Sequence, residues 1–270
     1  MRQFKLYNSA GQSYDLNDRG SFFHDPKGLG CENDADYERI GCQFLRTETG
    51  MKQPEPEGKI RFCDYDSYHT FAKFLQKTPL KLEYTAAQTY YMDVEIKKLK
   101  KTELETLGLI IEIEFSGLGP WYLDMVKCLE ASSIPGKEYA YTYPYVYKDS
   151  SRGTIRIESD SEIESPVQIT VIGPAHNLIY THYVNEIVVA SGKILYDLPI
   201  GSRMQISSKI PYTIQEIDSV GNTKDLYQYS DFSTERFLWI RRGTNEIFFS
   251  HEGSEDLQVA VEAMIYYDTI

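Results

Sequence analysis

The sequence predicts a mainly β fold in two domains: an N-terminal β-sandwich-like domain with one α-helix and a long β-hairpin, and a C-terminal β-sandwich. Apolar residues alternate with polar ones along most of the 270-residue chain, which is the period of half-buried strands. Tyrosine is unusually common, with 22 residues, and aromatic side chains favour pleated sheets. A break rich in glycine and proline lies near the midpoint, and domains of about 100–150 residues are the commonest size. We therefore expect domains at residues 1–133 and 134–270.

The first predicted elements come from short apolar stretches and the turn residues between them. Residues 8–11, Asn-Ser-Ala-Gly, suit a tight reversal between two strands, and Pro54 and Pro56 lie among charged residues. The expected elements are, in order, a hairpin over residues 4–16, a loop over 20–33, a strand over 37–45 and an exposed loop over 51–58.

One helix is predicted, over residues 64–78. Four apolar residues follow the spacing that lines one helix face. They are Tyr68, Phe71, Ala72 and Leu75. Asp64, Asp66 or Ser67 can cap the first N–H groups, whereas Pro79 cannot continue a helix.

Three strands are predicted after the helix, because alternation is strict over residues 80–84, 92–96 and 109–115. The last two flank the basic cluster Lys97-Lys-Leu-Lys-Lys101. We expect them to form an extended hairpin over residues 90–115 with the lysines at its tip. A solvated hairpin tip and a docking patch remain two open interpretations of these lysines.

The run Gly117-Leu-Gly-Pro-Trp-Tyr122 is predicted to be a hinge between the domains. Pro120 has no backbone donor and biases Gly119 toward extended geometry. We assign the hinge to Gly119, Pro120 and Trp121. A tyrosine-rich segment follows at residues 139–147.

The second half of the chain predicts a continuous series of strands and needs no helix. Short alternating segments recur with turn residues between them, as in a sandwich. The expected strands lie within residues 155–157, 167–172, 186–190, 203–206, 212–217, 237–240, 245–249 and 257–267.

Composition limits the classes of partner. A net charge of −12 repels nucleic-acid phosphates and anionic lipid headgroups, so we expect no specific nucleic-acid binding and no membrane binding. The four cysteines, at positions 31, 42, 63 and 128, lack the spacing of a zinc site or a disulfide framework. The absence of an apolar signal or an 18-residue apolar run predicts a soluble protein made in a cytoplasm.

No catalytic constellation stands out. The sequence has no nucleophile motif, phosphate loop or dinucleotide fingerprint, and of its five histidines only His176 and His182 lie close together. Acidic pairs such as Glu162 and Glu164 do not by themselves define a glycoside hydrolase site. We therefore expect no enzyme activity, no catalytic residues, no cofactor and no metal.

Carbohydrate binding is the alternative function, as a module that recognises a bacterial surface glycan. Exposed aromatic residues on a β-sandwich can stack on sugar rings, and Trp239 with nearby Arg241 is the natural candidate. Because Trp239 lies in an apolar strand, a position in the core is the favoured interpretation.

Several short motifs occur along the chain in a fixed order. In the first half they are Gly28-Leu-Gly30, Tyr68-x-x-Phe-x-x-Phe-Leu75, Leu80-x-Leu-x-Tyr84 and Pro120-Trp-Tyr122. In the second half they are Val171-Ile-Gly-Pro-Ala-His-Asn177, Asp231-Phe-Ser-Thr-Glu-Arg-Phe237 and Arg242-Gly-Thr-Asn-Glu-Ile-Phe248. In this order they resemble the distal tail proteins of siphophages, which have long, non-contractile tails. Leu178 departs from the proline that this pattern leads us to expect.

The resemblance implies a phage tail scaffold. Its N-terminal domain is expected to build a hexameric ring, and its C-terminal domain to be galectin-like and to project outward. Such a ring is the hub of the baseplate at the virion tail tip, assembled in the bacterial cytoplasm. The implied partners are other copies of the chain, the tail tube protein and the tail-associated or tail fibre protein, with a receptor-binding protein as a further candidate.

In this ring we assign the inter-subunit interface to the hairpin after the helix. The assigned residues are Tyr90, Met92, Val94, Ile96, Lys97, Lys98, Lys100, Lys101, Ile111 and Ile113.

Overall fold

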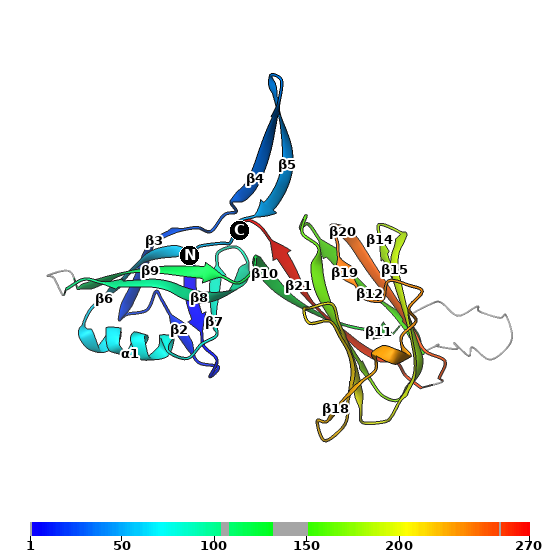
Figure 1. Cartoon of the computed structure of the whole chain (residues 1–270). Coiled ribbons are helices and arrows are strands. Elements are labelled where there is room, and N and C mark those ends of the chain that lie inside the picture. The colour runs from blue at the N-terminus through cyan, green and yellow to red at the C-terminus, as the bar shows by residue number, and fades with distance from the viewer. Residues whose placement is uncertain (1, 104–107, 132–150, 254) are drawn as a thin grey trace, which may run out of the picture. The chain divides into compact units, whose positions relative to one another are not determined.

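The computed structural model describes residues 2–103, 108–131, 151–253 and 255–270 (Figure 1). Within these residues the chain has one α-helix, one short 3-10 helix and otherwise strands, which confirms the mainly β fold class. The chain forms two compact units: an N-terminal unit of Met1–Leu123 and Tyr266–Ile270, and a C-terminal unit of Asp124–Ile265. The chain thus passes between the units twice.

The predicted boundary at residues 133 and 134 and the tyrosine-rich segment 139–147 both lie outside the described residues. That boundary stays a prediction.

The N-terminal unit is built from antiparallel strands that surround one core. The strands are β1 (Gln3–Tyr7), β2 (Ser13–Asp15), β3 (Ser21–Lys27), β6 (Glu57–Phe62), β7 (Leu80–Thr85), β8 (Thr89–Lys101), β9 (Leu109–Gly117) and β10 (Trp121–Cys128), the last of which runs on into the C-terminal unit. Their order is β2-β1-β7-β8-β9-β6-β3, and β10 also pairs with β8. Alternate apolar side chains such as Phe4, Leu82 and Phe115 fill the core, as the strand period predicts.

Helix α1 (Tyr65–Leu75) confirms the predicted helix but ends earlier than expected. Asp64 is the N-cap residue, and its side chain accepts a hydrogen bond from the backbone N–H of Ser67 at 2.7 Å. Phe71, Phe74 and Leu75 are buried in the core of the unit. The helix stops because Gln76 and Lys77 turn tightly, with the Lys77 N–H bonded to the Phe74 carbonyl, before Pro79 enforces the break.

The predicted loop over residues 20–33 and the predicted strand over 37–45 were both wrong. β3 forms within the expected loop, and its pairing with β6 shifts register between His24 and Lys27, so a bulge accommodates Pro26. The expected strand is instead a hairpin of β4 (Asn33–Ile40) and β5 (Gln43–Met51) that reverses at Gly41, whose φ of 64° suits a tight turn. We call this hairpin, residues 33–51, the arm.

The C-terminal unit contains two antiparallel sheets. One has the order β18-β17-β16-β13-β21 and the other β11-β12-β20-β14-β15. The first sheet comprises β18 (Thr223–Asp225), β17 (Thr213–Ile217), β16 (Arg203–Ser207), β13 (Ser165–Ile172) and β21 (Gln258–Tyr267), whose last residues belong to the N-terminal unit. The second comprises β11 (Glu130–Ala131), β12 (Arg152–Ser159), β20 (Gly243–Ser250), β14 (Ala175–Val184) and β15 (Ile187–Leu198). Strand β19 (Trp239–Ile240) pairs with β13, and the 3-10 helix η1 spans Tyr227–Tyr229.

Candidate assembly surface

The sheet of β1, β7 and β8 has one face on the core and one face away from it. Strand register places Lys5, Glu83 and Tyr91 side by side across the three strands, on the face opposite to the core residues Leu6, Leu82 and Met92. We call this side the outer face. It comprises Gln3, Lys5, Tyr7, Lys81, Glu83, Thr85, Thr89, Tyr91, Asp93 and Tyr122.

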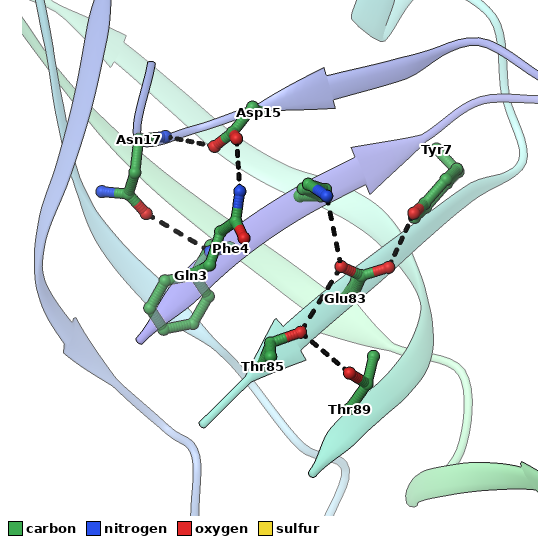
Figure 2. Close-up of polar contacts among 9 residues, drawn as sticks. Gln3, Phe4, Tyr7, Asp15, Asn17, Glu83, Thr85 and Thr89 are labelled. Atoms are coloured by element: carbon green, nitrogen blue, oxygen red, sulfur yellow. Dashed lines mark hydrogen bonds and ion pairs between the residues drawn. The ribbon is translucent and has the colours of Figure 1, made fainter. Parts of the chain in front are cut away.

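A buried carboxylate organises the outer face (Figure 2). Glu83 is only 6% exposed, and its Oε2 accepts a hydrogen bond from the Tyr7 hydroxyl at 2.6 Å. Lys5 Nζ lies 3.9 Å from Glu83 Oε1, and the Thr85 hydroxyl, itself 3.0 Å from that of Thr89, lies 3.5 Å from the same oxygen. The hydrogen bond to Glu83 raises the pKa of Tyr7 to about 12, so this hydroxyl remains a donor at neutral pH. The charge is thereby paired and hydrogen-bonded, as a buried carboxylate requires.

A second cluster on the outer face is aromatic. Lys81 Nζ lies 5.2 Å from the ring centroid of Tyr91 and 6.0 Å from that of Tyr122, within the range of cation–π attraction. The Tyr122 hydroxyl donates to Asp93 Oδ1 at 3.3 Å. The side chains of this face are therefore held by their neighbours before any partner binds.

The apolar residues that the sequence assigned to an inter-subunit interface point inward. Met92, Val94, Ile111 and Ile113 are 0% exposed and belong to the core of their own unit. Tyr90 and Ile96 are partly buried against the same core. The strand period had correctly grouped these side chains on one face, but that face covers the chain's own interior.

The four assigned lysines are exposed but already have partners within the chain. Lys97 pairs with Glu55 at 2.6 Å, Lys98 with Glu114 at 2.7 Å and Lys100 with Glu112 at 3.7 Å. Lys101 Nζ lies 5.0 Å from the ring centroid of Tyr65 on α1. Because neighbouring carboxylates offset most of their charge, these lysines are not a free basic patch.

The residues assigned to the hinge lie around the start of β10. Gly119 and Pro120 connect β9 to β10, and Trp121 opens β10 with 1% exposure in the core of the N-terminal unit. The division between the compact units follows Leu123. Trp121 thus anchors the N-terminal side of this connection, and movement at Gly119 and Pro120 stays a prediction.

The arm is the feature that sequence reasoning missed. Its two strands form a sheet of their own and pair with no other strand in the described residues (Figure 1). Register places Tyr37 opposite Arg46 and Phe44 opposite Arg39, so two aromatic and two basic side chains share one side. Tyr37 is 60% exposed and Phe44 70% exposed. Gly41, a turn-forming residue in the middle of residues 37–45, was the available signal.

No described helix is long and apolar enough to cross a membrane. Among the described residues, no group of three or more His, Cys, Asp or Glu side chains is arranged to bind a metal ion.

Comparisons with known proteins give two kinds of match. The family model for the distal tail protein, N-terminal domain, matches residues 3–118. No curated protein sequence matches the chain.

Among solved structures, a chain of the phage P2 baseplate, in its activated conformation with calcium, is 17% identical with a TM-score of 0.63, and the match covers 100% of both chains. The same values are found for the baseplate with strontium. The SPP1 Dit protein, described as a paradigm of the hub adsorption apparatus in phages that infect Gram-positive bacteria, is 10% identical with a TM-score of 0.65. That match covers 96% of this chain and 98% of the SPP1 protein. At these identities the structural matches establish a shared fold that extends over both units.

Proposed function

We propose that this chain is a distal tail protein, a structural component of the phage virion tail, and that six copies of it assemble into a closed ring. The ring is the hub that joins the tail tube to the adsorption apparatus at the tail tip. The N-terminal units build the ring, because the family match lies within them and they carry the arm. The number of six copies is taken from the resemblance to the family. The observation that supports self-assembly is the exposed arm.

The arm needs a partner for physical reasons. A two-stranded ribbon is marginally stable alone in water, and this one exposes Tyr37, Ile40, Phe44 and Leu45, each by more than half. Aromatic and arginine side chains are also the residue types that contribute most to binding at protein interfaces. We therefore assign the arm to the contact between neighbouring subunits.

The outer face of the next subunit is the proposed receiving surface. Its tyrosines are held by hydrogen bonds and cation–π contacts, which reduces the entropy lost when a partner orders them. Asp93 adds a carboxylate that complements Arg39 and Arg46 of the arm. A contact between two different surfaces is heterologous, and repeated heterologous contacts close into a ring when the rotation permits.

The remaining partners follow from the proposed position in the virion. One side of the ring contacts the tail tube protein, and the other contacts the tail-associated or tail fibre protein. The C-terminal unit is the proposed binding site for a receptor-binding protein. The net charge of −12 is consistent with a hub through which DNA passes without adhering.

The test is to measure the mass and shape of the purified protein with and without the arm's aromatic contacts. Wild-type protein is expected to show six times the 31.2 kDa chain mass in light scattering and rings in negative-stain images. The double variant Tyr37→Ser, Phe44→Ser is expected to be monomeric, because removing two interface aromatics weakens the contact by at least about 30-fold.

Phe22→Ser is the matched control, since Phe22 is 58% exposed on β3 and lies outside both the arm and the outer face. It should leave the ring intact. Wild-type protein that stays monomeric at tens of micromolar, even when mixed with its tail partners, would contradict the ring. Rings formed equally well by the double variant would contradict the role of the arm.

A further inference from the structure

The C-terminal unit carries an open groove of about 330 Å³ beside Trp239. Residues from several parts of the unit line it, including Tyr212, Phe237, Trp239 and Arg241. Its volume lies at the lower end of the range of small-molecule pockets, which suits a ligand the size of a sugar ring. Trp239 is half-buried and lines this groove. The apolar residues around it in the sequence had favoured a position in the core.

Two aromatic rings form a corner in the groove. Tyr212 is 51% exposed, and its ring meets that of Trp239 at 85° with centroids 6.4 Å apart. The Tyr212 ring also stacks on that of Phe237, with centroids 4.8 Å apart, and Phe237 is almost fully buried. Phe237 thus holds the Tyr212 ring in place, and the corner offers apolar faces against which the C–H groups of a flat ligand can pack.

His182 is a buried residue in the lining of the same groove. It is 0% exposed, and its Nε2 lies 3.0 Å from Asn245 Oδ1. The Asn245 amide nitrogen donates to the carbonyls of Arg241 and Gly243, so Asn245 Oδ1 is an acceptor and His182 Nε2 carries the proton. Burial lowers the pKa of His182, so the ring is neutral at pH 7 and Nδ1 is left as an acceptor. Nδ1 has no hydrogen-bond partner among the described residues.

The charged groups at the groove favour neutral or positively charged ligands. Arg241 Nε pairs with Glu164 Oε1 at 2.9 Å, while Glu235 also lines the groove. Two carboxylates against one guanidinium give the groove a net negative charge, which disfavours phosphate and carboxylate ligands. The same groups are good partners for hydroxyl and amine groups.

The backbone around the groove is fixed before any ligand binds. The Ser191 N–H donates to the Glu235 carbonyl at 3.1 Å, and the Ser208 hydroxyl donates to the Leu238 carbonyl at 2.6 Å. The Arg241 N–H donates to Asn245 Oδ1 at 3.0 Å. Such pre-ordering lowers the entropic cost of binding.

We propose that this groove binds a neutral or amine-bearing saccharide ring, stacked against Tyr212 and Trp239 and hydrogen-bonded by Glu235 and Arg241. This site goes beyond the scaffold role, because ring assembly requires none of these residues. It gives the hub a direct contact with hydroxyl-rich polymers.

The experiment is a saturation-transfer NMR titration of the full-length protein with glucose, galactose, N-acetylglucosamine, glucosamine and, as the anionic probe, glucuronic acid. Signals and measurable affinity are expected for at least one neutral sugar or for glucosamine, with glucuronic acid the weakest binder. Tyr212→Ala is expected to weaken that binding by about tenfold, because it removes one stacking face from an exposed position. Phe22→Ala, an exposed aromatic on the other unit, should leave binding unchanged.

Glu235→Gln provides a second readout that does not depend on the aromatic corner. Removing this carboxylate is expected to weaken glucosamine binding several-fold while changing glucose binding by less than about twofold. No signal from any sugar, or equal binding by wild type and Tyr212→Ala, would overturn the proposal. Ring formation is measured on the same samples, so that a loss of sugar binding can be distinguished from a loss of assembly.

Discussion

Glu83 shows how a single residue organises the outer face. A carboxylate with 6% exposure is costly unless its charge is compensated, and here Tyr7, Lys5 and Thr85 all lie against it. The interaction also acts on Tyr7, whose pKa rises to about 12 chiefly through the hydrogen bond to Glu83. One side chain therefore links β1 to β7 and raises the pKa of a tyrosine.

Replacing Glu83 with glutamine is expected to lower the free energy of unfolding of the N-terminal unit by about 1–3 kcal/mol, because a charge-assisted hydrogen bond becomes a neutral one. Urea denaturation followed by circular dichroism measures the change. Glu95→Gln on the exposed part of β8 is the control and should cost much less. An equal loss in both variants would mean that the Glu83 carboxylate has no special role.

His182 predicts a pH dependence of the C-terminal unit. Burial holds its folded-state pKa below the unfolded value of about 6.5. The unfolded chain therefore takes up a proton first, and the stability that the neutral ring contributes is present above pH 6.5 and lost as the pH falls. Between pH 7 and pH 5 the urea midpoint of His182→Gln should fall less than that of wild type. The exposed His69 replaced by glutamine should follow wild type, and equal slopes in all three would contradict this assignment.

At the scale of elements, sequence patterns predicted the α-helix, the hairpin of β8 and β9 and most strands of the C-terminal unit. Alternation identifies residues that share a face of a strand, but it does not say which face meets the chain's own core. Met92 and Val94 were therefore grouped correctly on one face, and that face covers the core of their own unit. The lysines of β8 were recognised as a cluster, but the glutamates that pair with them come from β9 and from residue 55, which only the folded chain brings close.

Turn chemistry explains the other differences. Pro26 argued for a loop, yet the bulge in β3 keeps it within the sheet, and Gly41 was too weak a signal to divide residues 37–45 into two strands. The groove beside Trp239 was beyond prediction for a related reason. Tyr212, His182 and Trp239 are far apart in sequence and converge only when the loops between the strands are placed.

The N-cap of α1 gives a prediction at this scale. Asp64 accepts the Ser67 N–H, so Asp64→Ala should destabilise the N-terminal unit by about 1 kcal/mol. Asp64→Asn keeps a capping oxygen and should cost only a few tenths of that, which makes it the matched control. Thermal or urea denaturation monitored at 222 nm measures both. Equal losses would indicate that charge at the helix start matters more than the cap hydrogen bond.

At the scale of the whole molecule, the N-terminal unit is completed by the last residues of the chain. Tyr266–Ile270 belong to it, and Tyr267 and Ile270 pack against its core. The Tyr267 ring meets that of Tyr90 edge to face with centroids 5.4 Å apart. A fragment of residues 1–133, the N-terminal domain predicted from the sequence, would therefore lack part of the N-terminal unit.

Tyr267→Ala is expected to lower the stability of the N-terminal unit by about 1–2 kcal/mol and to leave the C-terminal unit unchanged, since it removes an aromatic contact with one core only. Hydrogen exchange read by mass spectrometry can follow the two units separately. Thr269→Ala, at an exposed position in the same segment, serves as the control. Loss of protection confined to the C-terminal unit would contradict the placement of Tyr267.

The double passage of the chain between the units also has a consequence for covalent integrity. Two domains that are joined by a single linker separate when a protease cuts that linker once. Here the backbone leaves the N-terminal unit after Leu123 and returns after Ile265, so either crossing alone keeps the units tethered. A single cut in either crossing would leave the C-terminal unit attached to the N-terminal unit, and separating the two would take two cuts.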